Sequence, residues 1–188
     1  RYTFFELANA GADYVRCGIG SGFGCLSTSN TGVHMPMASL IDEIMKIKRT
    51  HHLNCKIIAD GGVKNYADII KAIALGADYV MCGNIFARML ESAAQKTYSN
   101  EQQFDAKLYY FEDIKIEGGE WYGTYIGETK GCLTFGNRKK LGNIEAIFYG
   151  MASKEGQIAL NGAKTKTSEG VKKIIHVTYT IHGWVENF

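Results

Sequence analysis

Residues 18–25 hold four glycines in alternate positions and end in a cysteine, Cys25. Such a glycine-dense loop lets backbone groups converge on a phosphate or an ion, and it leaves the thiol in a loop instead of a packed core. The hydroxyls of Ser27, Thr28 and Thr31 follow at once, so a proton relay beside the thiol is chemically available. Spacing alone singles out none of the three, and a buried, inert cysteine is the alternative.

Two further polar turns each follow a predicted strand and precede a predicted helix. They are Asp60-Gly61-Gly62 and Gly83-Asn84. The first N–H groups of a helix can accept a phosphate there, and a carboxylate such as Asp60 can take ribose hydroxyls. Structural turns also use Asp-Gly and Gly-Asn, so each motif alone is ambiguous.

Hydrophobic periodicity in the first 95 residues alternates between strands and helices. It predicts a helix end at 4–10, strands at 13–17, 56–59 and 78–82, and helices at 37–51 and 66–75. Residues 10–18 are nearly repeated at 75–83, an offset of 65 residues. In each copy a glycine ends a helix and another glycine closes the following strand. This rhythm predicts a parallel β/α architecture with its glycines at the carboxyl ends of the strands.

We therefore expect an α/β fold of the (β/α)8 TIM-barrel type, of which the chain carries about the last three βα units plus a β-rich insertion. A complete barrel needs eight strands in about 250 residues, so we read the 188 residues as a portion of a longer polypeptide. The expected boundaries are 1–96 for the barrel portion with the cysteine loop, 97–146 for the insertion, and 147–188 for a return to the barrel with an active-site flap loop. Short antiparallel strands are expected at 108–111, 121–126 and 144–148, and a mobile loop at 154–173.

Composition excludes several classes of function. The formal charge is only +2, which argues against nucleic acid as a partner, and no apolar run reaches the roughly 18 residues of a membrane span. Five cysteines occur without a Cys-x-x-Cys pair, which fits a cytoplasmic protein better than a disulfide framework or zinc cage.

Four segments in one order carry a resemblance. They are residues 18–25 with 31–33, 57–62, 79–83 and 148–153. Together they resemble the IMP dehydrogenase and GMP reductase family, whose fold is a β/α barrel. The resemblance implies a thiolate that attacks C2 of a purine nucleoside monophosphate while a nicotinamide cofactor, NADPH or NAD, exchanges hydride at that carbon. It also implies a homotetramer.

The resemblance assigns roles residue by residue. Cys25 matches the nucleophile, Ser27 the neighbouring hydroxyl, and Glu169 the glutamate that works with that hydroxyl in reductases. Substrate contacts fall on Asp60, Gly61, Gly62, Gly83, Asn84, Gly150, Met151, Ala152, Ser168 and Gly170, and cofactor contacts on Gly18, Ile19 and Gly20. The carbonyls of Gly20, Gly22 and Cys25 match those that hold potassium in many members. Phe23 stands where the family usually has a phosphate-binding serine, which leaves Ser21 as the hydroxyl that could replace it.

The direction of reaction follows from the expected flap. Between Ser153 and Glu169 there are only 15 residues and no arginine, whereas dehydrogenases carry a long flap with an Arg-Tyr pair that activates water. The resemblance therefore favours a GMP reductase that converts GMP and NADPH to IMP and ammonia. The alternatives are an IMP dehydrogenase that forms XMP, a non-catalytic nucleotide-binding regulator, and a barrel enzyme for another phosphorylated substrate.

Overall fold

The computed structural model describes residues 1–98, 111–129, 132–163, 168 and 170–186. The chain forms two compact units. Unit 1 comprises residues 1–86 and 149–172, and unit 2 comprises residues 87–148 and 173–188. Every described residue that the sequence assigns to the candidate site falls in unit 1.

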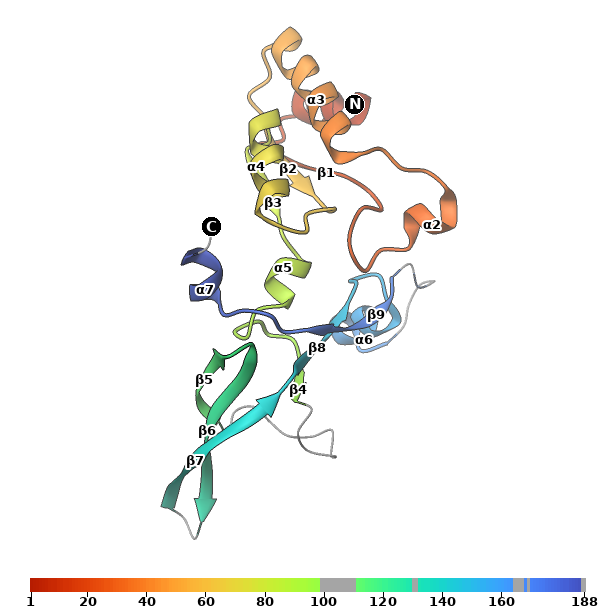
Figure 1. Ribbon diagram of the computed structural model, residues 1–188. Coiled ribbons are helices and arrows are strands. Elements are labelled where there is room, and N and C mark those ends of the chain that lie inside the picture. Colours follow the sequence, from red (N-terminus) through yellow and green to blue (C-terminus); the bar gives the residue numbers. More distant parts are fainter. Residues whose placement is uncertain (99–110, 130–131, 164–167, 169, 187–188) are drawn as a thin grey trace. The chain divides into compact units, whose positions relative to one another are not determined.

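Unit 1 is built on a three-stranded parallel sheet in the order β1-β2-β3 (Figure 1). The strands are β1 (Tyr14–Cys17), β2 (Lys56–Asp60) and β3 (Tyr79–Met81). They alternate with α1 (Tyr2–Asn9), α3 (Met37–His51) and α4 (Tyr66–Leu75). The predicted β/α alternation is thereby confirmed, with every predicted boundary within two residues of the observed one.

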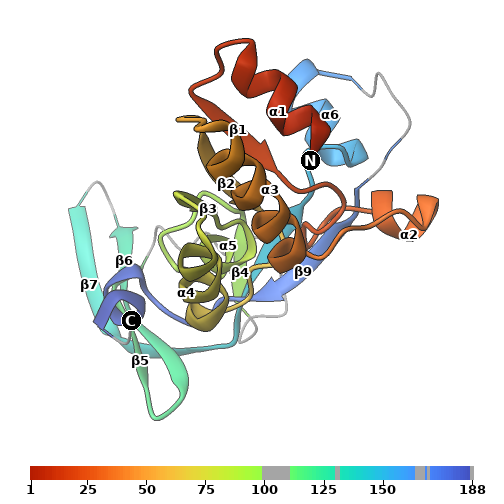
Figure 2. The same cartoon turned by 90° about the horizontal axis from the view of Figure 1, so that it is seen from above.

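Helices α1, α3 and α4 pack on one face of this sheet (Figure 2). Alternate residues of β1 and β2 are buried against the helices: Val15, Cys17, Ile57 and Ala59. The helices contribute Phe4, Ile41, Ile44 and Ala72. Since strand side chains alternate between faces, the residues between these point the other way, and Tyr14, Tyr79 and Met81 are exposed.

Local signals explain where α4 begins and ends. The side chain of Asn65 accepts a hydrogen bond from the backbone N–H of Asp68, which satisfies one of the free donors of the first turn. Gly76 ends the helix in the left-handed conformation at φ +115°. A side chain at Gly76 would also overlap Met45 of α3, so this glycine both stops the helix and allows the two helices to approach.

Unit 1 also contains three shorter helices, α2 (Ser27–Thr31), α5 (Asn84–Ala87, whose last residue lies in unit 2) and α6 (Lys154–Asn161). The expectation of a loop over residues 154–173 is wrong at both ends, because α6 occupies its start and β9 (Lys172–His176) begins before its end. Ser153 caps α6 by accepting from the N–H of Gly156 at 3.0 Å, and Gly162 ends it in the left-handed conformation. The composition of residues 154–173 therefore wrongly predicted a loop. The capping residues Ser153 and Gly162 mark the two ends of the helix.

Unit 2 contains the β-rich part of the chain. One sheet has the order β4-β8-β9, with β4 (Lys96–Tyr98) antiparallel to β8 (Ile144–Tyr149). The other is an antiparallel sheet of β5 (Phe111–Glu117), β6 (Glu120–Thr129) and β7 (Cys132–Gly142), and α7 (Ile181–Glu186) closes the described chain. The antiparallel strands predicted at 121–126 and 144–148 are confirmed, whereas residues 108–110 lie outside the described part.

Trp121 anchors the core of unit 2. It is 4% exposed, and its indole Nε1 donates to the carbonyl of Val177 at 3.1 Å. Leu141, Ile144, Ala146 and Ile175 complete this buried cluster. Unit 2 thus has an apolar core of its own.

Candidate functional site

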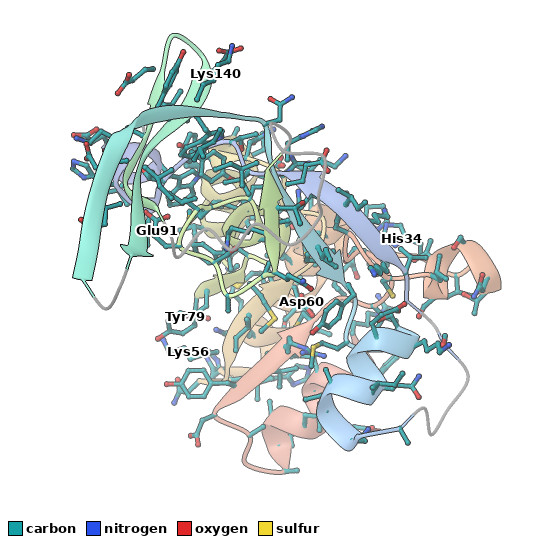
Figure 3. The ribbon with its side chains drawn as sticks, turned by 90° about the horizontal axis from the view of Figure 1, so that it is seen from below. His34, Lys56, Asp60, Tyr79, Glu91 and Lys140 are labelled. Atoms are coloured by element: carbon teal, nitrogen blue, oxygen red, sulfur yellow. The ribbon has the colours of Figure 1, made fainter. Side chains whose placement is uncertain are left out.

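The carboxyl ends of the three parallel strands bring the predicted site loops to one edge of the sheet. Cys17 is the register partner of Ala59, and Asp60 is the partner of Met81, so all three strands end at the same level. The loops that follow begin at Gly18, Gly61 and Cys82. Figure 3 labels Lys56 and Asp60 at the two ends of β2, with Asp60 at the site edge.

Cys25 is half-buried at the end of the glycine loop, and its thiol donates a hydrogen bond to the hydroxyl of Ser27 at 3.3 Å. A tight turn holds the cysteine there, because its backbone N–H donates to the carbonyl of Gly22 at 3.0 Å. Cys25 thus has a hydroxyl within reach of its sulfur, as a proton relay requires.

Three other cysteines whose side chains the structure describes, Cys17, Cys55 and Cys82, lack this setting. Cys17 and Cys55 are buried, and desolvation by burial raises the pKa of Cys17 to about 11, with a smaller contribution from Cys55. Burial also raises the pKa of Cys82, which is half-buried. A thiol whose pKa is raised holds little of the reactive thiolate at neutral pH. The hydrogen bond to Ser27 therefore distinguishes Cys25 from these three thiols.

Two distant segments close on the cysteine loop through their backbones. Cys25 forms an isolated antiparallel bridge with Gly170, and the N–H of Val171 donates to the carbonyl of Gly24 at 3.0 Å. The N–H of Gly150 in turn donates to the carbonyl of Val171 at 3.2 Å. The sequence-predicted residues at 25, 150 and 170 are thus brought together, although some 145 positions separate them in the chain.

Glycine is required at both closing segments because the backbones approach so closely. A Cβ at Gly150 would lie 2.7 Å from the carbonyl oxygen of Gly24, and a Cβ at Gly170 would lie 2.9 Å from the backbone nitrogen of Ser153. Both distances are shorter than non-bonded atoms tolerate. We refer to residues 24–25, 150–153 and 170–171 as the backbone clamp.

The loop after β1 also wraps around the peptide bond between Asp60 and Gly61. The hydroxyl of Ser21 donates to the carbonyl of Asp60 at 3.1 Å. A side chain at Gly18 would overlap that same carbonyl, and one at Gly61 would overlap the Ser21 hydroxyl. The thiol loop and the Asp60-Gly61-Gly62 turn therefore interlock.

Arg16 is a site residue that the sequence reasoning missed. It lies on β1 and its Nε is 3.2 Å from the Oδ2 of Asp60, whose side chain is 27% exposed. The register explains the pairing, because Arg16 and Asp60 share the open face of two adjacent strands. The signal available in the sequence was a charge at a strand position two residues before the glycine loop.

Two buried oxygens beside the site have no hydrogen-bond partner among the described residues: Oγ1 of Thr28 and Oδ1 of Asn84. Thr28 lies against Gly20, where any side chain would overlap its hydroxyl. Asn84 begins α5 directly after Gly83. Buried polar atoms of this kind are expected to find a partner when a ligand or water binds.

The remaining predicted residues are placed as follows. Ile19 is 83% exposed and Met151 64% exposed, Gly20, Gly62 and Ala152 lie in the loops described above, and Ser168 lies two positions before Gly170. Glu169 lies outside the described residues. Within the described ranges, the His, Cys, Asp and Glu side chains form no group of three that could hold a metal ion. In the same ranges no helix combines the length and apolarity needed to cross a bilayer.

Comparisons with known proteins agree with this arrangement. The profile of the IMP dehydrogenase / GMP reductase domain matches residues 2–110. An inosine-5'-monophosphate dehydrogenase from Borreliella burgdorferi is 30% identical over an alignment of 192 positions, which covers 91% of this chain and 46% of the relative. A GMP reductase from Caenorhabditis elegans is 38% identical over 105 residues, 56% of this chain and 28% of the relative. The chain therefore spans about half, or less, of these curated relatives.

A solved structure shares the fold. The crystal structure of a Trypanosoma brucei GMP reductase variant in complex with guanosine 5'-monophosphate superposes with a TM-score of 0.64 and 21% identity, over 99% of this chain and 30% of that one. The α/β fold is therefore similar to that of a GMP reductase. With the domain profile matched over more than half of its residues, the chain belongs to the IMP dehydrogenase / GMP reductase family.

Proposed function

We propose that the chain is part of a purine nucleotide oxidoreductase that acts as a GMP reductase. The observation that carries this proposal is the half-buried thiol of Cys25. It is hydrogen-bonded to Ser27 at 3.3 Å, and its backbone pairs with Gly170 in the backbone clamp. A nucleophile beside a hydroxyl, in a loop shaped by glycines, is what covalent attack on a purine ring needs.

Cys25 and Ser27 would share the covalent step. The thiol loses its proton, the sulfur bonds to C2 of GMP, and the 2-amino group leaves as ammonia. Ser27 is placed to carry a proton between the thiol and the leaving amine, with Glu169 as its proposed partner. A nicotinamide cofactor, when bound, supplies the hydride that C2 gains as the C–S bond breaks and IMP is released.

The interlocked loops would hold the nucleotide. We assign the ribose to Asp60, which Arg16 orients, and the phosphate to backbone N–H groups of Gly61, Gly62 and Gly83 with Asn84. The amide nitrogen of Asn84 would donate to the phosphate, whereas its Oδ1, an acceptor without a partner among the described residues, would take a hydroxyl or a water. Gly150, Met151, Ala152, Ser168 and Gly170 would border the base.

The residues also fit the cofactor and the cation. Gly18 and Gly20 present no side chains, and Ile19 is exposed enough to meet a planar ring. Carbonyl oxygens at Gly20, Gly22 and Cys25 are suitable ligands for a potassium ion. The Gly22 carbonyl already accepts the N–H of Cys25 but keeps a second lone pair.

The open face of the sheet supports the barrel proposal. Parallel sheets are covered on both faces in known folds, yet Tyr14 and Tyr79 are 57% and 50% exposed on the face opposite the helices. We propose that further β/α units cover this face and complete a barrel. Four described cysteines are free, which fits a reducing cytoplasm.

The test is turnover by the full-length protein, followed by the absorbance of the reduced nicotinamide. Loss of signal with GMP and NADPH, together with release of ammonia, establishes the reductase reaction. Gain of signal with IMP, NAD and potassium instead assigns the dehydrogenase reaction, which the relative from Borreliella burgdorferi is named for. Nucleotide binding without either reaction would support the regulator.

A further inference from the structure

We propose that Ser21 is a positioning residue that fixes the orientation of the Asp60–Gly61 peptide and thereby sets the affinity of the site for the phosphate of its nucleotide. The inference rests on the proposed function and deepens it. It begins from one contact, the hydrogen bond of 3.1 Å from the Ser21 hydroxyl to the Asp60 carbonyl.

The peptide between Asp60 and Gly61 leaves the end of β2, where Asp60 and Met81 are the last pair of the ladder with β3. Gly61 lies at φ +99°, in a region that few other residues adopt, and glycine tolerates either sign of φ. A rotation of this peptide would exchange the directions of its C=O and N–H groups at little cost within the turn itself. Beyond this last ladder pair, a contact from the neighbouring loop is needed to hold the orientation.

Ser21 supplies the contact from the loop that holds this peptide. A trans peptide is planar, so its C=O and N–H point to opposite sides of the chain. Because the hydroxyl of Ser21 binds the carbonyl of Asp60, the N–H of Gly61 points away from the thiol loop. A proposed phosphate donor is thus held in one direction before the ligand arrives, which lowers the cost of binding.

The surrounding packing supports this role. Besides the contact with Ser21, a Cβ at Gly61 would lie 3.0 Å from the backbone nitrogen of Gly22, and a side chain at Gly18 would overlap the Asp60 carbonyl. The carbonyl is therefore enclosed by backbone on one side and by a single hydroxyl on the other. Ser21 is partly buried in this position, and its bond joins residues 39 positions apart.

This geometry changes the role expected for Ser21 from the sequence. A serine near a phosphate site is first read as a direct ligand, and Phe23 leaves that role open. The hydroxyl proton of Ser21 is instead directed at Asp60. Ser21 would therefore act on the phosphate through the Gly61 N–H and not by donating to it.

The experiment compares IMP with inosine, which differ only in the phosphate, as ligands of the full-length protein. The ligand concentration that halves the rate at which iodoacetamide alkylates Cys25 gives the affinity for each ligand. Ser21→Ala should weaken the binding of IMP about five- to tenfold, which is the effect of losing one hydrogen bond. The affinity for inosine should stay within about twofold of the wild-type value. Ser29→Ala is the matched control, because its hydroxyl binds only the local carbonyl of Leu26 and is exposed.

Other outcomes separate the two proposals. The positioning role would be overturned if Ser21→Ala lost affinity equally for IMP and inosine, or lost affinity for neither, while the wild type still binds IMP. A fall in thermal midpoint with an equal loss for both ligands would show a purely structural role and also overturn it. Failure of the wild type to bind IMP at all would remove the proposed function itself, and this inference with it.

Discussion

The thiol of Cys25 donates its hydrogen bond to Ser27, two residues further along the chain and in the first turn of α2. The sequence offered three hydroxyls for this role, Ser27, Thr28 and Thr31. The structure separates them. The Thr31 hydroxyl donates to the carbonyl of Ser27 at 2.7 Å, and the Thr28 hydroxyl is buried against Gly20. Ser27 is the one of the three that reaches the sulfur.

Replacing Cys25 with alanine should abolish turnover, by about 1,000-fold or more, because the covalent step loses its nucleophile. Nucleotide binding should largely survive, since no proposed phosphate or ribose contact uses the thiol. Steady-state kinetics and calorimetric titration with IMP measure the two effects. Cys82→Ala is the matched control, and appreciable activity remaining in Cys25→Ala would contradict the covalent mechanism.

Iodoacetamide at pH 8 should modify Cys25 before Cys17, Cys55 and Cys82. Burial raises the pKa of Cys17 to about 11, so only about one Cys17 side chain in a thousand is a thiolate at pH 8. Peptide mapping after partial labelling gives the order of reaction. The expectation fails if Cys17 or Cys55 is labelled as fast as Cys25 in the folded protein.

Local chemistry made unit 1 predictable, and long-range pairing limited what the sequence could show. Asn65 and Gly76 bound α4 with side-chain and backbone signals that lie within the helix and its flanks. The pairing of Arg16 with Asp60, by contrast, depends on the register of β1 against β2. The bond from Ser21 to Asp60 depends on how two loops fold over each other. Neither relationship leaves a spacing that can be read along the chain.

Arg16→Gln should raise the KM for the nucleotide about three- to tenfold and change kcat little. The ion pair holds one carboxylate oxygen of Asp60, so its loss frees the side chain to rotate away from the ribose. Steady-state kinetics with varied nucleotide measure this split. Arg49→Gln, in the exposed last turn of α3, is the control that should behave as wild type. A large fall in kcat with unchanged KM would contradict an orienting role.

Asp78→Asn should destabilise the protein by about 1.5–3 kcal/mol at neutral pH, the range for hydrogen bonds to a charged group. The carboxylate accepts from the backbone N–H of Ile57 at 2.8 Å and pairs with Lys56 at 3.1 Å and Lys48 at 3.4 Å. Burial alone would raise the pKa of Asp78, but these partners outweigh burial and lower it below its usual value.

The same contacts fix the sign of the pH dependence. A carboxylate whose pKa is lowered by folding stabilises the protein above its unfolded pKa of about 3.9 and loses that contribution as the pH falls through the folded value. Urea unfolding should therefore show the difference between wild type and Asp78→Asn in full above about pH 5 and shrinking below it. Asp13→Asn, at the equivalent position of the repeat, is the control. A difference that grows toward acid pH would contradict the assignment.

Gly150→Ala and Gly170→Ala should each destabilise unit 1 by about 1–3 kcal/mol, the cost of overpacking. Both added methyl groups meet backbone atoms of the clamp, which cannot move aside as a flexible side chain would. The shift they force falls on Gly24, next to Cys25, so turnover should fall more than stability alone explains. Gly83→Ala is the steric control for stability alone, because a Cβ there meets nothing within 4 Å. Thermal unfolding of the three variants, with turnover of the two clamp variants measured well below each midpoint, decides the matter. Equal midpoints for Gly150→Ala and Gly83→Ala would show that residues 150–153 do not close on the thiol loop.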